Sequence, residues 1–468
     1  MVFADLLFIY LFLPAVLGIY YFFQAQHRNL ILVTASILFY TWGEPIWVIL
    51  LIISAAVDYN CGKFIASRTS AAGRRLGLAA SLVTNLSLLI VFKYSGFLVT
   101  NLNWVMGAQF PVPQLTLPIG ISFYTFQTIS YTVDVYRGKT QVQESFLNFL
   151  LFVSLFSQLI AGPIVRYTDI SREIDRRSTN YTEFAQGLRR FIIGLFKKVA
   201  IANSAGHLAS VWLNRGLEEQ TVAGAWFGAL MFSLQIYYDF SGYSDMAIGL
   251  GRMFGFHFPE NFNYPYIAKS VEDFWRRWHI SLSSFFRDYL YIPLGGKHRR
   301  LYLNLLIVWF LTGLWHGASW NFVVWGLYYL VFLVLEKTFL GKILTKIPAP
   351  LAHLYLVLVV IIGWVLFYFT DFGKAIDLLQ VMFFVKHTPL LDVEIQITLA
   401  NNLYWLLASL VFCAPLYFWF QKLIGVVEVR LGTAAGSAVL TFSSLGALAI
   451  STMLLVGQSY NPFLYYRF

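Results

Sequence analysis

The sequence is poor in charged residues and in cysteine. Only 12% of its 468 residues are Asp, Glu, Lys or Arg, whereas 58% are hydrophobic and the mean hydropathy is +0.66. A soluble globular domain carries about 25% charged residues, so this composition excludes an ordinary soluble domain and predicts a polytopic integral membrane protein. The two cysteines, Cys61 and Cys413, lie in or beside apolar segments without the spacing of metal ligands. They argue against a disulfide framework and against a zinc site.

Low-complexity tracts, long linkers and internal repeats are also absent from the sequence. We therefore expect a single integral-membrane domain over residues 1–468. The N-terminal apolar stretch has no basic region before it and no small-residue cleavage site before His27 and Arg28. It is expected to be a retained first membrane span rather than a signal peptide.

Apolar runs that could cross a bilayer, alone or in pairs, follow one another along the chain. Proline and glycine interrupt several of them, as at residues 117–120 and 161–163, where kinks or re-entrant turns packed inside protein are expected. The sequence thus predicts an all-α fold with about 11–13 transmembrane or re-entrant helices around a central tunnel. Beyond the first span, the expected segments lie near residues 29–57, 76–93, 115–133, 146–165, 188–213, 221–256, 301–335, 351–370, 374–385, 398–421 and 436–458.

The formal net charge of +10 comes from basic residues that cluster in short loops between apolar runs. Two such regions, 166–198 and 269–300, are the most basic, and the positive-inside rule places both at the cytoplasmic face. Membrane lipids are therefore the expected partners of these charges, and no nucleic-acid partner is expected.

Residues 269–300 have the pattern of an amphipathic helix that lies at the membrane interface. Helical spacing places Phe274, Trp278 and Phe285 on one side, and the arginines between them face water or anionic groups. We expect one interfacial helix here, carrying His279.

The longest uncharged run of the chain, residues 301–335, has His316 in its middle. A straight helix of this length would measure about 52 Å, whereas the hydrocarbon core is only ~30 Å thick. The run must therefore break, and Gly313 and Gly317 flank the histidine where a break is easiest. An ionisable group at membrane depth is costly enough to indicate a functional site, although a packing histidine hydrogen-bonded between helices is the alternative.

Asp239 and Asp245 are the other costly groups within an apolar stretch. Each needs a cationic partner or a water-filled cavity, and each could hold a nearby arginine or histidine in place. The alternative is that both mark a helix end at the level of the lipid headgroups. The remaining histidines lack metal-ligand spacing, so no metal site is expected.

Two strings, FWRRWHISLSSFFRDYLYIPLGG at 274–296 and TGLWHGASWNFVVWG at 312–326, closely resemble motifs of the membrane-bound O-acyltransferase family, in its bacterial polysaccharide-modifying branch. The resemblance extends to residues 118–138, 159–167 and 235–266 and so covers most of the chain. It is the combination that is specific, since any one string alone is only suggestive.

The resemblance implies transfer of an acetyl group from a cytoplasmic thioester donor, across the membrane, for O-acetylation of an exported polysaccharide such as alginate. His316 matches the catalytic histidine of the family, and His279 matches its second motif histidine. A neutral imidazole can take the proton from an acceptor hydroxyl while that oxygen attacks the thioester. The donor, acetyl-CoA or an acyl-carrier thioester, is a substrate, and no bound cofactor is expected.

Two further sets of residues have a functional reading and a simpler one. Arg276, Arg277 and Trp278 would lie at the donor entrance, where arginine suits phosphate, but lipid headgroups are phosphates too. Tyr465 in the C-terminal tail matches a tyrosine of the resembling branch and could accept an acyl group for a time, whereas an aromatic interface belt explains it more simply.

The resemblance also implies a multi-pass protein of the bacterial cytoplasmic (inner) membrane. Its expected partners are periplasmic acetyltransferase subunits and a polysaccharide synthase complex. The alternatives are O-acetylation of cellulose or peptidoglycan, D-alanylation of teichoic acid, and a non-catalytic transporter of an acyl group or polymer. A scaffold that has lost catalysis would not need the intact His279 and His316.

Overall fold

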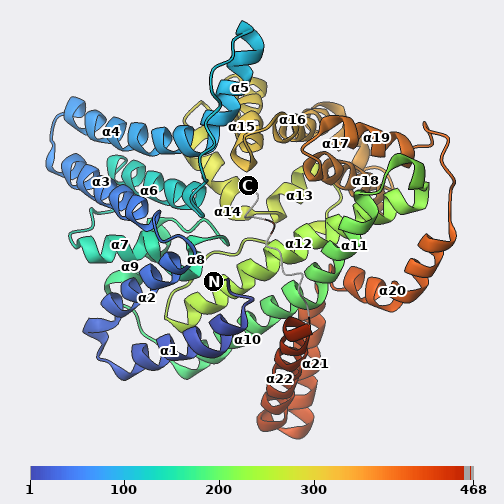
Figure 1. Cartoon of the computed structure of the whole chain (residues 1–468). Coiled ribbons are helices and arrows are strands. Elements are labelled where there is room, and N and C mark those ends of the chain that lie inside the picture. Colours follow the sequence, from blue (N-terminus) through green and yellow to red (C-terminus); the bar gives the residue numbers. More distant parts are fainter. Residues whose placement is uncertain (1, 458–463, 465–468) are drawn as a thin grey trace. The chain divides into compact units, whose positions relative to one another are not determined.

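The computed structural model describes residues 2–457 and Leu464, and its regular elements in that range are helices without any strand (Figure 1). This confirms the predicted all-α fold. By its internal contacts the chain divides into two compact units. Unit 1 holds the described residues up to Phe191 with Ser244–Glu260 and Arg287–Leu290, and unit 2 holds Ile192–Tyr243, Asn261–Phe286 and the described residues from Tyr291 onward. The single domain over residues 1–468 stays a prediction.

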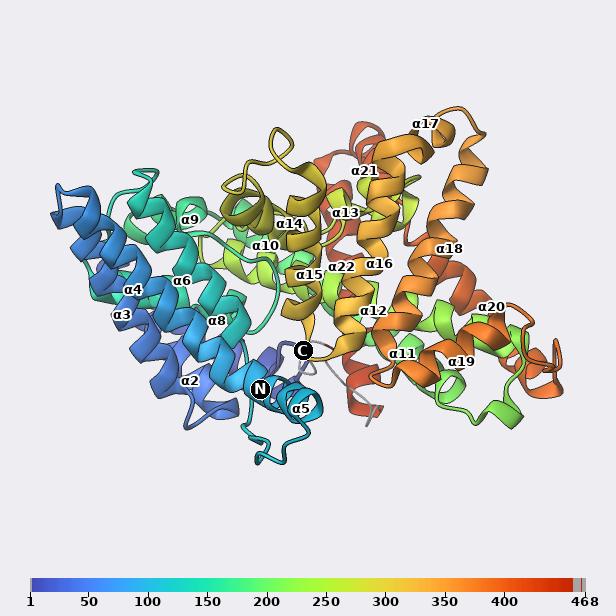
Figure 2. The ribbon, with the colours of Figure 1, turned by 90° about the horizontal axis from the view of Figure 1, so that it is seen from above.

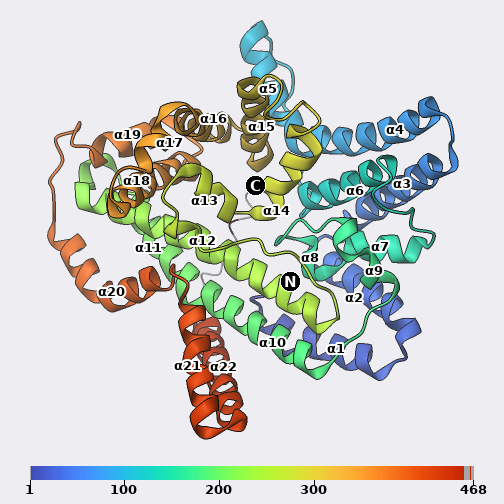
Figure 3. The ribbon, with the colours of Figure 1, turned by 180° about the vertical axis from the view of Figure 1, so that it is seen from behind.

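Unit 1 contains the N-terminal helices. α3, α4 and α6 lie side by side in it (Figures 1 and 3). Its α-helices are α1 (Leu13–Phe22), α2 (Arg28–Gly43), α3 (Val48–Ser67), α4 (Ala71–Leu89), α5 (Ser95–Met106), α6 (Ile121–Tyr136), α7 (Phe146–Ser154), α8 (Phe156–Leu159), α9 (Tyr167–Asp175), the first part of α10 (Tyr181–Phe196) and the last part of α12 (Val222–Met253).

A buried polar network joins the three neighbouring helices of unit 1. The Asp58 carboxylate of α3 accepts hydrogen bonds from Ser81 Oγ at 2.5 Å and from Asn85 Nδ2 at 2.8 Å, both on α4. Asn85 Oδ1 in turn accepts from Thr128 of α6 at 3.1 Å. Because hydrocarbon offers no hydrogen bonds, these internal partners satisfy the carboxylate and tie the helices together.

Unit 2 contains the helices that follow. α15, α16 and α18 lie side by side (Figure 2), and α21 and α22 form an antiparallel pair (Figures 1 and 3). The α-helices of unit 2 are the last part of α10, α11 (Asn203–Leu213), most of α12 (Val222–Met253), α13 (Val271–Arg277), α14 (Ile280–Phe286), α15 (Leu301–His316), α16 (Trp320–Leu335), α17 (Gly341–Leu344), α18 (Ala349–Tyr368), α19 (Phe372–Met382), α20 (Val393–Val411), α21 (Leu416–Leu431) and α22 (Thr433–Gly457).

Five helical stretches of the described chain are long and apolar enough to cross a membrane, and two shorter apolar ones, Phe8–Phe22 and Leu301–His316, accompany them. This agrees with the predicted polytopic membrane protein. Which of the other expected segments cross, and the central tunnel, stay predictions. The five are Val48–Ser67, Ala71–Met106, Trp320–Leu344, Ala349–Tyr368 and Thr433–Gly457.

The two interruptions by proline and glycine are irregular, as predicted. Gly120 has a φ of +77°, and a Cβ at this position would lie 2.6 Å from the Leu159 carbonyl oxygen, so only glycine fits. Residues 161–165 lie between α8 and α9 without helical structure, yet all five are buried. Irregular backbone of this kind is tolerated in a membrane protein only where protein or water covers it.

His257, just beyond α12 in unit 1, lies between two carboxylates. Its Nδ1 is 2.7 Å from Glu173 Oε1 and its Nε2 is 3.0 Å from Glu183 Oε2. Partial burial lowers the pKa of His257, but the hydrogen bonds and charges of the two carboxylates outweigh this, so the pKa lies above its ordinary value. The folded protein therefore favours the protonated imidazole.

We expect His257 to stabilise the protein in a pH-dependent way. Because the folded pKa is raised, the contribution is fully present below the unfolded value of about 6.5 and is lost as pH rises through the folded pKa. The half-exposed site limits it to under about 1 kcal/mol. The measurement is the difference in thermal unfolding midpoint between wild type and His257→Gln, which should be larger at pH 6 than at pH 9. An equal difference at both pH values would contradict the assignment.

Candidate active site

His316 is the last residue of α15, directly before the chain breaks. The break lies at residues 317–319, and α16 then begins at Trp320. A Cβ on Gly317 would lie 2.2 Å from the Phe322 ring, and one on Gly313 would lie 2.4 Å from the Phe322 carbonyl oxygen. The predicted break next to the histidine is confirmed, and both glycines allow the two helices to approach closely.

Aromatic rings surround the His316 side chain, which is only 4% exposed. The Trp325 ring is 4.9 Å from the imidazole centroid at an interplanar angle of 80°, and the Phe367 ring is 5.4 Å away at 78°. Trp315 packs at 4.9 Å. These edge contacts, which come from α15, α16 and α18, fix the plane of the imidazole ring in a site that excludes bulk water.

The sequence predicted one continuous interfacial helix that carries His279. This prediction is wrong, because the helix is interrupted at that residue. α13 ends at Arg277 and α14 begins at Ile280, while His279 itself has a φ of +45° in the left-handed region. The reason is a competing hydrogen bond, because Ile280 N–H donates to the carbonyl oxygen of Asn261 at 3.0 Å rather than to a carbonyl of the preceding turn. Where the sequence predicted one helix, the chain forms two short ones with the histidine between them.

The Asn261 side chain also orients the imidazole of His279. Its Oδ1 lies 3.0 Å from His279 Nδ1 and accepts a hydrogen bond from Ser281 Oγ at 2.8 Å. An amide oxygen is an acceptor, so Nδ1 carries the proton and Nε2 presents its lone pair. Nε2 is buried and makes no hydrogen bond within the described residues.

Burial lowers the pKa of His279, and the nearby His316 lowers it further. The ring is 1% exposed, with Phe240 perpendicular to it at a centroid distance of 4.6 Å. The surroundings of His279 therefore favour its neutral form.

The Trp315 ring contacts the rings of both histidines. It is 6.0 Å from the His279 ring and 4.9 Å from the His316 ring, measured between centroids. Unit 2 thus brings the predicted histidines of the two motifs into one buried site. Two histidines in one aromatic enclosure are suited to accept, hold and return a proton.

The residues expected at a donor entrance differ in exposure. The Arg276 side chain is 73% exposed and lies 2.7 Å from Glu272, whereas Arg277 is more covered and lies 3.0 Å from Asp273. Trp278 is only 2% exposed and packs against Trp364 with ring centroids 4.9 Å apart. Arg276 alone of the three presents its polar group openly at the surface.

Asp239 and Asp245 lie inside α12 rather than at a helix end, and each has a cationic partner. In unit 2, Asp239 Oδ1 is 2.7 Å from Lys198 Nζ, and its Oδ2 accepts the Leu464 N–H at 2.9 Å. In unit 1, Asp245 is 2.9 Å from Arg190, which also pairs with Glu260. The expected need for partners is confirmed, with a lysine as the partner of Asp239. Tyr465 lies outside the described residues.

Sequence reasoning missed Asn261 and Glu336 as residues that position the site. Glu336, the first charge after the uncharged run, accepts the backbone N–H groups of Val271 at 2.6 Å and Glu272 at 2.9 Å. Its carboxylate therefore caps the start of α13. Asn261 could have been noticed because it lies in the string at 235–266, which resembles the family. Its hydrogen bond to His279, 18 positions away, could not be predicted from the spacing of residues.

Comparison with known proteins places this site in a family context. Residues 139–372 match the model of MBOAT, the membrane-bound O-acyltransferase family. The chain is 39% identical to the probable alginate O-acetylase of Azotobacter vinelandii over all of both chains, and 43% identical to that of Pseudomonas aeruginosa over 82% of this chain and 75% of the relative. It is also 37% identical to the peptidoglycan O-acetyltransferase of Helicobacter pylori, over 82% of this chain and 80% of the relative. Both histidines fall within the matched range, and the chain belongs to the membrane-bound O-acyltransferase family and is an O-acyltransferase.

Proposed function

We propose that the protein transfers an acetyl group from a cytoplasmic thioester, across the bacterial inner membrane, for O-acetylation of exported alginate. The observation that supports this most directly is the buried site of unit 2, in which the rings of His316 and His279 both contact the Trp315 ring. The similarity to alginate O-acetylases over the full chain supports the choice of acetyl group and of polymer.

In the proposed reaction His316 is the general base. It takes the proton of the acceptor hydroxyl while that oxygen forms a bond to the thioester carbonyl carbon, and the carbon–sulfur bond then breaks. The proton passes from the imidazolium to the departing thiolate, so His316 is regenerated. Its place as the last residue of the 16-residue α15 suits this role, because the negative end of the helix dipole stabilises a cationic imidazolium.

His279 is proposed to assist by holding the acceptor hydroxyl near His316. Its fixed tautomer leaves Nε2 as an acceptor, which suits a hydrogen bond from a hydroxyl. Arg276 is proposed to contact phosphates of the donor, acetyl-CoA or a carrier-protein arm, at the surface. Only the small acyl end enters the site, because the phosphates cannot be moved into hydrocarbon without a large cost.

The natural acceptor is proposed to include periplasmic acetyltransferase partners that complete the esterification next to the polysaccharide synthase. Peptidoglycan is the second candidate polymer, supported by the Helicobacter relative. The experiment that separates them supplies acetyl-CoA with a labelled acetyl group to membranes containing the protein and its partners, and measures label in alginate and in peptidoglycan. Label in alginate with release of free coenzyme A supports the proposal, whereas label in peptidoglycan alone favours the second candidate. Movement of label across the membrane without free coenzyme A would indicate a transporter.

Asn261→Leu should lower the rate of acetyl transfer about tenfold, since it removes the hydrogen bond that orients His279, worth roughly 1–1.5 kcal/mol. Ser281→Ala, which keeps Asn261 in place, should have a smaller effect. The measurement is the steady-state release of coenzyme A, with KM and kcat determined separately. A lower kcat with an unchanged pH profile would argue against control of the imidazole, because a misoriented His279 should also shift that profile.

A further inference from the structure

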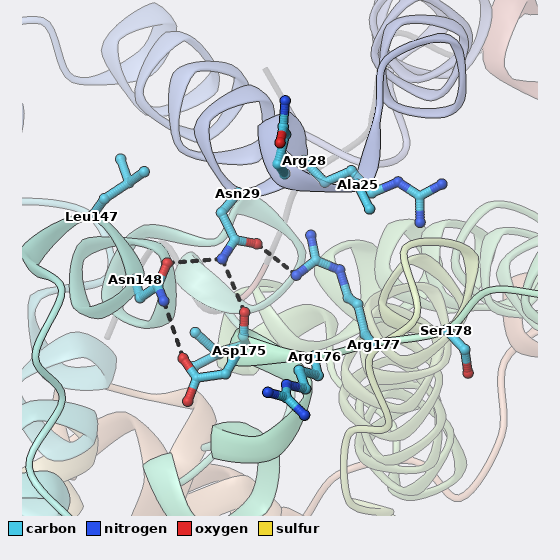
Figure 4. Close-up of a pocket in the computed structure, with 11 residues that line it drawn as sticks. Ala25, Arg28, Asn29, Leu147, Asn148, Asp175, Arg176, Arg177 and Ser178 are labelled. Atoms are coloured by element: carbon cyan, nitrogen blue, oxygen red, sulfur yellow. Dashed lines mark hydrogen bonds between the residues drawn. The ribbon is translucent and has the colours of Figure 1, made fainter.

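A pocket of about 780 Å³ opens in unit 1, away from the histidines, where the α1–α2 connection, the start of α7 and the end of α9 meet (Figure 4). Its charged lining consists of three arginines, Arg28, Arg176 and Arg177, and one aspartate, Asp175. The pocket is therefore positively charged, and its other polar lining residues are Gln26, Asn29, Asn148 and Ser178.

The one carboxylate of the pocket, that of Asp175, accepts hydrogen bonds from uncharged side chains. Asp175 Oδ1 accepts hydrogen bonds from Asn148 Nδ2 and from Gln143 Nε2, each at 3.1 Å. Among the described residues, none of the three arginines forms an ion pair. Their charge is therefore available to a ligand.

Hydrogen bonds hold the guanidinium group of Arg177 in place, but not all of its donors have a partner in the described part of the chain. Its Nε donates to Tyr20 Oη at 2.8 Å. Its Nη1 donates to Asn29 Oδ1 at 2.6 Å, and Asn29 donates to the Ile174 carbonyl at 2.9 Å (Figure 4). Its Nη2 is buried and has no hydrogen-bond partner within the described residues, and the same is true of Arg28 Nε. Buried donors that are left unsatisfied are rare, and an anionic acceptor would satisfy them.

We propose that this pocket binds a phosphate group. Guanidinium groups match the geometry of phosphate oxygens, and the start of α2 at Arg28 adds the positive end of a 16-residue helix. The lining residues Asp175–Ser178 belong to the basic region expected at the cytoplasmic face, where both anionic lipid headgroups and soluble phosphate esters occur. The ligand chemistry is the same for both sources, and the site does not depend on the proposed acetyl transfer.

The test uses the full chain in nanodiscs and the double variant Arg28→Gln with Arg176→Gln. Arg177 is left in place because it holds Tyr20 and Asn29. Arg172→Gln is the matched control, since this exposed arginine lies on α9 outside the pocket. One arm measures binding of adenosine 3′,5′-bisphosphate in phosphatidylcholine nanodiscs, and the other measures phosphatidylglycerol retained through purification by native mass spectrometry. Thermal unfolding of each variant checks that it is folded.

Loss of bisphosphate binding by at least about tenfold in the double variant, but not in the control, supports the proposal with a soluble ester as ligand. Loss of retained phosphatidylglycerol with the same selectivity supports it with a lipid headgroup as ligand. The proposal is overturned if the wild type binds neither probe, or if Arg172→Gln reduces binding as much as the double variant, since diffuse surface charge would then explain the result.

Discussion

His316→Ala is expected to reduce release of coenzyme A from acetyl-CoA by about 10²–10⁴-fold, with little change in donor KM. The imidazole sits within an aromatic enclosure at the end of α15, and the Trp315 ring of this enclosure also contacts His279. Alanine has no group that can take the proton, so the acceptor hydroxyl is left without a general base. The measurement is a thiol-detection assay on the purified protein in nanodiscs with a soluble polysaccharide acceptor.

Two further variants make this result interpretable. His316→Gln nearly keeps the volume of the ring but cannot act as a base, so it should lose activity to a similar extent while unfolding at nearly the wild-type temperature. His387→Ala removes an exposed histidine and should leave the rate unchanged. Retained activity in both His316 variants would refute the general-base mechanism, whatever the behaviour of His279.

Gly326→Leu is expected to have the largest effect on the fold of unit 2. A Cβ at this position would lie 2.4 Å from the Trp309 carbonyl oxygen and 3.2 Å from the backbone of Gly313. The side chain would force α15 away from α16, which should lower the free energy of unfolding by at least about 1–3 kcal/mol. Because His316 ends α15, the rate of acetyl transfer should fall together with stability.

Gly446→Leu on α22 provides the matched control, because nothing lies within 4 Å of a Cβ built at that glycine. The same side chain should there be neutral or slightly stabilising, since leucine favours a helix more than glycine does. The thermal unfolding midpoint, followed by tryptophan fluorescence, compares the two. Equal midpoints for both variants would mean that the close approach of α15 and α16 does not limit stability.

The break at His316 could be predicted from the sequence because it follows from a length limit. Thirty-five uncharged residues cannot cross a ~30 Å core as one straight helix, and glycine marks where the chain can turn. The need of Asp239 and Asp245 for partners was predictable for a similar reason, since an unpaired charge in an apolar stretch is too costly. These conclusions depend on local sequence and on the thickness of the bilayer alone.

The break at His279 could not be predicted in this way. Its helical pattern is intact, and the hydrogen bonds that interrupt it come from Asn261, which is distant in sequence. Lys198, the partner of Asp239, likewise lies on another part of unit 2. The choice of His279 and His316 as site residues came from the family resemblance. Their placement in one buried site could not be predicted, because no spacing rule relates residues on separate helices. Tertiary hydrogen bonds thus determine where a helix ends and which residues pair, which the periodicity of the sequence does not show.

The hydrogen bond from Leu464 to Asp239 also bears on how the protein is made. It joins residues 225 positions apart, so the carboxylate on α12 has been synthesised long before its last donor leaves the ribosome. During that interval one oxygen of a buried carboxylate lacks a native hydrogen bond, which is a costly state inside an apolar unit. The Asp239 carboxylate therefore obtains this hydrogen bond only after residue 464 has been synthesised, and a chain that stops before that residue lacks it.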